Sequence, residues 1–93
     1  MSEIEGTIHV TRLSKEGERE PWAYDVAFAP HAGGGGALPV RQVQGDGELR
    51  KLLRDGVGVL PEYLDKTVKD ARAGHAILPR VRLTPEQKRA LRL

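Results

Sequence analysis

The 93-residue sequence contains no cysteine. Disulfide bonds, thiol nucleophiles and cysteine-based zinc sites are therefore excluded. The sequence also lacks any apolar run near the roughly 18 residues that a membrane-spanning helix needs. Its acidic, alternating start, MSEIEGTIHV, is unlike a signal peptide. These absences predict a cytoplasmic protein that has no membrane partner.

Motifs for catalysis and cofactor binding are also missing. The histidines His9, His31 and His75 are far apart in the sequence and do not form an H-E-x-x-H motif. Neither serine, Ser2 or Ser14, lies in the sequence context of a catalytic nucleophile. We therefore expect no enzymatic activity, no cofactor and no metal.

A glycine run interrupts the chain after its second predicted strand, in the segment HAGGGGALP. A phosphate-binding loop requires a helix directly after the glycines and usually a lysine. Here the run is followed by Ala37, Leu38 and Pro39, which predict an extended segment. We therefore interpret residues 31–37 as a flexible loop between two strands.

Aromatic residues are scarce, at 4% of the sequence, and three of the four lie in one short segment. Trp22, Tyr24 and Phe28 share one face of a predicted strand with Val26. Such a face is usually core, although a platform for stacking bases has the same spacing. We predict that Trp22, Val26 and Phe28 are buried against four residues of the following helices, namely Leu52, Leu53, Leu64 and Val68.

The apolar periodicity predicts the order β-β-β-α-α-β-α in a single domain, residues 1–93. Period-two alternation predicts strands, and i, i+3, i+4 spacing predicts helices. The predicted strands cover 4–13, 21–29, 38–44 and 76–83; the predicted helices cover 46–56, 61–73 and the residues after Thr84. This order indicates an α+β fold with a small antiparallel sheet of three to four strands, an αα-hairpin and a C-terminal helix.

Individual residues refine this prediction. Pro39 has no N–H to donate to a sheet, so its strand is expected at an edge. In the last strand, alternation places Ile77, Val81 and Leu83 on one face, and Leu78, Arg80 and Arg82 on the other. Asp46 is the expected N-cap of the first helix, which should end near Gly56, and the second helix should run from Pro61 to Gly74. The segment Thr84–Gln87 is a capping box.

Charge is distributed unevenly along the chain. Residues 1–30 carry six acidic side chains against three basic ones, whereas residues 72–93 carry six basic side chains against one acidic one. The basic end is a candidate nucleic-acid-binding strip. Its members are Arg80, Arg82, Lys88, Arg89 and Arg92, with Lys88 and Arg92 expected one helical turn apart.

Two functions remain open at this point, besides an enzyme or small-ligand site near the glycine loop, which the sequence supports least. The first is a non-catalytic module that binds a protein partner or self-associates, because edge strands can accept a further strand. The alternative is nucleic-acid binding through the basic C-terminal strand and helix. The helical pair is less suited to reading DNA, because residues 61–73 carry as many acidic as basic side chains.

Overall fold

A computed structural model of the chain describes residues 3–32 and 36–93. The four strands are β1 (Ile4–Arg12), β2 (Ala23–Pro30), β3 (Leu38–Gln44) and β4 (His75–Leu83). The helices are α1 (Gly45–Lys51), α2 (Pro61–Arg72) and α3 (Pro85–Ala90), and a π-helical segment, η1 (Leu52–Val57), continues α1 without a break. The predicted α+β order is therefore confirmed, with α1 and η1 together forming its first helix.

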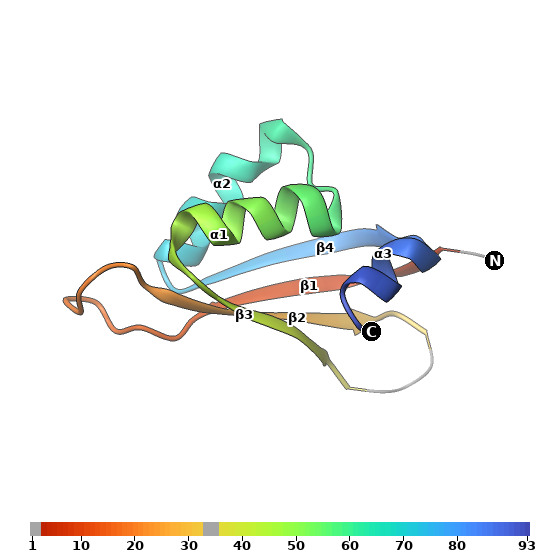
Figure 1. Ribbon diagram of the computed structural model, residues 1–93, viewed down its shortest axis with the longest axis horizontal. Helices are drawn as coiled ribbons and strands as arrows, with labels where there is room; N and C mark the ends of the chain where they lie inside the picture. Colours follow the sequence, from red (N-terminus) through yellow and green to blue (C-terminus); the bar gives the residue numbers. More distant parts are fainter. Residues whose placement is uncertain (1–2, 33–35) are drawn as a thin grey trace.

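The strands form one open antiparallel sheet in the order β3-β2-β1-β4. The helices lie on one side of this sheet, and the described part of the chain leaves its other face uncovered (Figure 1). β3 is an edge strand, as Pro39 predicted, and β4 is the other edge. No helix in the described residues is long and apolar enough to cross a membrane.

The core lies between the sheet and the helices. Alternate residues of β1 and β2 face it, and Ile8, Val10, Val26 and Phe28 are almost fully enclosed. The predicted partners on the helices, Leu52, Leu53, Leu64 and Val68, are buried in the same cluster.

Trp22 is only half-buried, so its predicted full burial is wrong. It lies just before β2, and its ring contacts the guanidinium groups of Arg12 and Arg72, whose carbons lie 4.9 and 4.8 Å from the ring centroid. Its indole N–H donates to the Glu18 carbonyl at 2.9 Å. Its contacts with two guanidinium groups, and the hydrogen bond made by its own N–H, keep this ring at the edge of the core.

The predicted faces of β4 are wrong in its first half. Gly6 pairs with Val81, but Ile8 pairs with Leu78, so β4 contains a bulge with one extra residue. A bulge reverses the relation between sequence position and sheet face. As a result, Leu78 turns toward the covered face, whereas Ile77 is 52% exposed. Val81 and Leu83 are buried as predicted.

Most helix boundaries agree with the prediction. Pro61 is the first residue of α2, and the capping box of Thr84 and Gln87 is present at the start of α3. Asp46 is not the N-cap of α1; it lies in the first turn, and Gln44 holds the cap position. The first helix ends at Val57, next to the predicted Gly56, and Gly58 is its C-cap with a φ of 82°.

Candidate functional site

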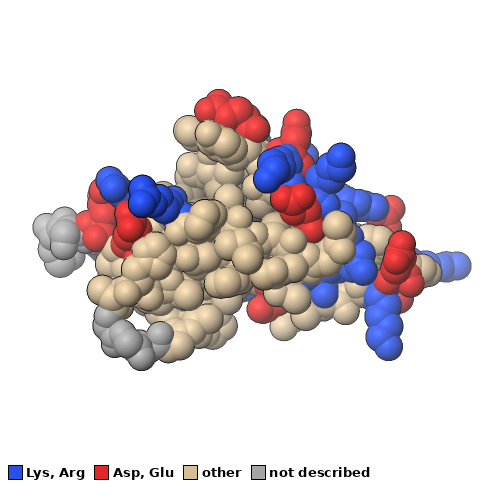
Figure 2. Space-filling model, turned by 180° about the vertical axis from the view of Figure 1, so that it is seen from behind, with Lys and Arg blue, Asp and Glu red and all other residues tan. Residues whose placement is uncertain are grey.

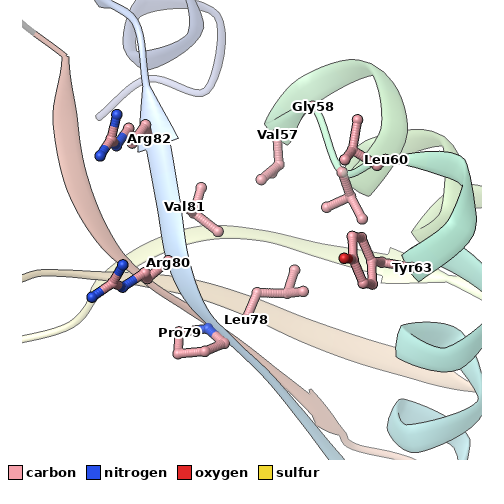
Figure 3. Close-up of a pocket in the computed structure, with 10 residues that line it drawn as sticks. Val57, Gly58, Leu60, Tyr63, Leu78, Pro79, Arg80, Val81 and Arg82 are labelled. Atoms are coloured by element: carbon pink, nitrogen blue, oxygen red, sulfur yellow. The ribbon is translucent and has the colours of Figure 1, made fainter.

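A groove runs beside β4 at the free edge of the sheet. It has a volume of about 520 Å³ and lies between β4 and the segment that joins η1 to α2 (Figure 3). Its lining residues are Val57, Gly58, Val59, Leu60, Tyr63, Leu78, Pro79, Arg80, Val81 and Arg82. Figure 3 shows Leu78 and Val81 on one side of the groove facing Val57, Leu60 and Tyr63 on the other. Arg80 and Arg82 point away on the other side of β4.

The segment between η1 and α2 forms the outer wall of the groove. Gly58 adopts the left-handed conformation that ends η1, and the Val59 N–H donates to the Leu53 carbonyl at 2.9 Å. Leu60 is extended, with φ −66° and ψ 146°, because it precedes the first residue of α2, Pro61. This path leaves Leu60 54% and Tyr63 55% exposed, which is more than the burial expected for large apolar side chains.

The backbone of β4 alternates between groups that pair with β1 and groups that face outward. The Arg12 N–H donates to the Gly74 carbonyl at 2.9 Å, so the pairing of β1 with β4 begins at that position. Backbone groups alternate along a strand, so those of His75 and Ile77 point away from β1.

The same alternation is found beyond the bulge. The Glu5 carbonyl accepts the His31 N–H at 3.0 Å, so the backbone of Glu5 faces β2 and not β4. Arg82, the cross-strand neighbour of Glu5, therefore presents its own N–H and C=O at the free edge. Pro79, in the bulge, has no N–H.

Two arginines of β4 lie on the face of the sheet that the helices do not cover, here called the open face. Their surroundings differ. The Arg82 Nε lies 3.2 Å from a Glu5 carboxylate oxygen. This hydrogen bond, and a second from His31, lower the pKa of Glu5. Among residues 3–32 and 36–93, no acidic side chain forms an ion pair with Arg80. Arg80 is thus an exposed cation whose charge is not balanced by a direct partner.

The structure does not place all members of the predicted basic strip side by side. Arg80 and Arg82 lie on β4, but Lys88 lines a separate hollow with Ile4, Phe28 and Leu38. Arg89 is exposed on α3. Arg92 is not one turn beyond Lys88 on a helix, because α3 ends at Ala90 and Arg92 has a φ of 60°.

Charges of both signs also occur together on the surface. Figure 2 shows a broad uncharged area in the middle of one face, with basic and acidic side chains intermixed toward its two ends. Intermixed charges weaken the field at a distance. This face therefore does not carry a continuous basic strip.

A polar cluster at the hairpin end of the sheet forms ion pairs and hydrogen bonds within the chain. Arg72 lies 2.7 Å from both Glu20 and Asp46, and its carbonyl accepts a hydrogen bond from the Arg12 guanidinium. The Tyr24 hydroxyl donates to Asp46 at 2.8 Å. Burial, followed by this acidic neighbour, raises the pKa of Tyr24 to about 12. These bonds connect the β1–β2 hairpin to α1 and α2, which indicates a structural role.

The histidines lie on or beside the open face of the sheet. The rings of His9 and His75 stack with centroids 5.6 Å apart, whereas His31 is hydrogen-bonded to Thr7 and Glu5. Within the part of the chain that the structure describes, no three histidine or acidic residues lie close enough to hold a metal ion. Of the predicted loop 31–37, residues 33–35 lie outside the described residues.

Sequence reasoning missed the wall of the groove, Leu60 and Tyr63. The available signal was a pair of large apolar residues around Pro61 that does not continue the apolar stripe of α2. Comparison of the chain with protein-family models, with curated proteins and with solved structures gives no match.

Proposed function

We propose that this chain is a non-catalytic protein-interaction module that binds an extended segment of a partner protein along β4. The observation that supports this proposal is the apolar groove of about 520 Å³ next to an unpaired strand edge. In β-strand addition, main-chain hydrogen bonds provide affinity, and pockets for alternate side chains provide specificity. β4 offers both, through its outward backbone groups and through the wall formed by Leu60 and Tyr63.

A second copy of the chain is a less suitable occupant. Antiparallel pairing of two β4 strands would place Arg80 and Arg82 close to the same arginines of the other copy. Like charges on neighbouring strands are destabilising. We therefore favour a different protein as the partner.

Nucleic acid remains the alternative ligand, supported by the exposed Arg80, which has no ion-pair partner in the described part of the chain. The test is a titration into short RNA and DNA at several salt concentrations, for the native chain and for the variant with Arg80→Ala and Arg82→Ala. Each neutralised phosphate should steepen the salt dependence by about 0.9 log units on duplex DNA. We expect no binding at low salt, and binding that the double variant abolishes would favour nucleic acid over a peptide.

The groove is tested with a peptide of alternating valine and threonine that has flanking residues at both ends. Backbone amide NMR of the protein detects its binding. We expect shifts and slower hydrogen exchange at the outward amides, Ile77 and Arg82. A version of the peptide with methylated backbone nitrogens should not bind, because strand addition needs those N–H groups. The proposal is wrong if the peptide leaves the β4 amides unchanged, or if the methylated version binds equally well.

A matched pair of variants distinguishes peptide binding in the groove from nonspecific binding to exposed apolar side chains. Leu60→Ser removes an exposed apolar side chain from the groove wall. Leu13→Ser removes one that is 46% exposed and outside that wall. We expect Leu60→Ser to weaken peptide binding and Leu13→Ser to leave it unchanged. Equal losses in the two variants would contradict a localised groove.

A further inference from the structure

We infer that the β4 edge selects segments in which apolar and acidic residues alternate, with the apolar side chains in the groove. This inference rests on the proposed function and names the chemistry of the partner. It is carried by the position of the bulge, which places Leu78 and Val81 on one face of β4 and Arg80 and Arg82 on the other.

The bulge places two apolar residues of β4 on the groove side. Leu78 and Val81 both face the groove although they are three positions apart, because one residue of the bulge is extra. A strand added beside β4 has the same alternation as its neighbour, so its residues opposite Leu78 and Val81 also enter the groove. The walls that receive them are Val57, Leu60 and Tyr63, which carry no charge.

The intervening residues of the added strand would lie on the open-face side, next to Arg80 and Arg82 (Figure 3). Opposite charges on neighbouring strands are favourable, and like charges are unfavourable. Arg80 forms no ion pair within the described residues, whereas the Arg82 Nε lies 3.2 Å from a Glu5 carboxylate oxygen. An acidic residue of the added strand beside Arg80 would therefore balance a charge that the described residues leave unbalanced.

The spacing limits the length of the preferred segment. The part of β4 that lines the groove covers five residues, Leu78–Arg82. At about 3.3 Å per residue, a segment of four or five residues spans this distance. Two apolar residues that alternate with two acidic ones form the shortest pattern that contacts both Leu78 and Val81, as well as both arginines.

The experiment compares three flanked peptides of equal length by amide NMR and fluorescence anisotropy. Valine alternates with glutamate in the first, with lysine in the second and with threonine in the third. We expect the glutamate peptide to bind about tenfold more tightly than the threonine peptide, and the lysine peptide to bind most weakly. Added salt should reduce the preference for glutamate.

Charge reversal in the protein provides the matched test. Arg80→Glu with Arg82→Glu should reverse the order of the glutamate and lysine peptides. Arg41→Glu reverses one charge on the β3 edge and should leave the order unchanged. Both β4 side chains are exposed, so the variants should fold, and unchanged thermal unfolding verifies this.

The outcomes separate the two proposals. If none of the peptides perturbs the β4 amides, the proposed function fails and this inference fails with it. If the threonine peptide binds as tightly as the glutamate peptide, the groove stands but the acidic preference is wrong. If reversal at Arg41 changes the order as much as reversal at Arg80 and Arg82, the preference arises from net charge and the inference is overturned.

Discussion

The two edges of the sheet resemble each other in the backbone and differ in their surroundings. β3 and β4 each contain a proline and a bulge; the bulge lies next to Pro39 in β3 and includes Pro79 in β4. A hollow lies beside each strand, of about 350 Å³ at β3 and about 520 Å³ at β4. What differs is the chemistry of the lining.

The hollow beside β3 carries charges of both signs. Its lining includes Arg41, Glu48, Lys51 and Asp55, and the Glu48 carboxylate already accepts the Gln44 N–H at 2.9 Å. Charged side chains at an edge strand discourage the addition of another strand. At β4 the groove wall is apolar, and the charges lie on the other face of the strand. An unpaired edge alone therefore does not indicate a binding site. The side chains beside the edge determine whether a further strand can be added there.

The largest expected effect comes from a substitution in the core, which supports both edges of the sheet. Phe28 is 1% exposed in the core between β1, β2 and the helices. Phe28→Ala should lower the free energy of unfolding by about 3–5 kcal/mol, because it removes buried apolar contacts and leaves a cavity. Urea denaturation followed by circular dichroism measures the loss. A change below about 1 kcal/mol would show that this site is not enclosed.

High pH should act on the β3 side of the sheet through Tyr24, which pairs with Val43 of β3. The pKa of Tyr24 is raised from 10.0 to about 12, so the unfolded chain releases the proton before the folded chain does. The resulting stability is full below pH 10 and is lost as the pH rises to 12, by about 2–3 kcal/mol. The difference in unfolding free energy between the native chain and Tyr24→Phe, measured from pH 8 to 12, tests this. Parallel pH profiles would contradict it.

Gly6→Ala should disturb the β4 side. A Cβ at Gly6 would lie 2.5 Å from the Phe28 Cζ and 2.6 Å from the Ala29 carbonyl oxygen. β1 must then shift where it pairs with Val81, at a cost of about 1–3 kcal/mol. Hydrogen exchange should accelerate more in β4 than in β3, and Gly36→Ala, where an added Cβ meets nothing, is the control. Equal acceleration at both edges would argue against a local effect.

The smallest expected effect comes from a substitution that removes one charge from the hollow beside β3. Lys51→Leu removes an exposed cation from the hollow beside β3 and should change stability by no more than about 0.5 kcal/mol. The valine–glutamate peptide should still shift the β4 amides and not those of β3, because Arg41, Glu48 and Asp55 remain in that hollow. New shifts at the outward amides of β3 would show that a single charge protects the β3 edge.

The parts of the fold that were predictable depend on neighbours in sequence. Alternation along β1 and β2 located the strands, and Pro61 and the Thr84–Gln87 box located two helix starts. The exposure of Ile77 was not predictable, because the bulge that reverses the faces of β4 arises from pairing with β1. Trp22 was misplaced for a related reason, since one of the cations that hold it, Arg72, lies far along the chain.

The candidate site was predictable only in part. Edge strands and exposed arginines could be read from the sequence, and Arg80 and Arg82 are indeed exposed on β4. The groove could not, because its two walls come from separate segments that meet only when α2 packs against β4. Of the predicted basic strip, Lys88 lines a separate hollow, and Arg92 lies beyond the end of α3 with a φ of 60°.

The strand order also affects the time course of folding. β1, β2 and β3 follow one another and can pair by closing local loops, whereas β4 must return to β1 across the whole helical segment, residues 45–72. Longer loops cost more entropy to close, and distant contacts form slowly. We therefore expect β4 to dock last, after the three-stranded meander has formed. The groove and its strand edge then come into existence in the final step, so an incompletely folded chain has no binding surface to offer.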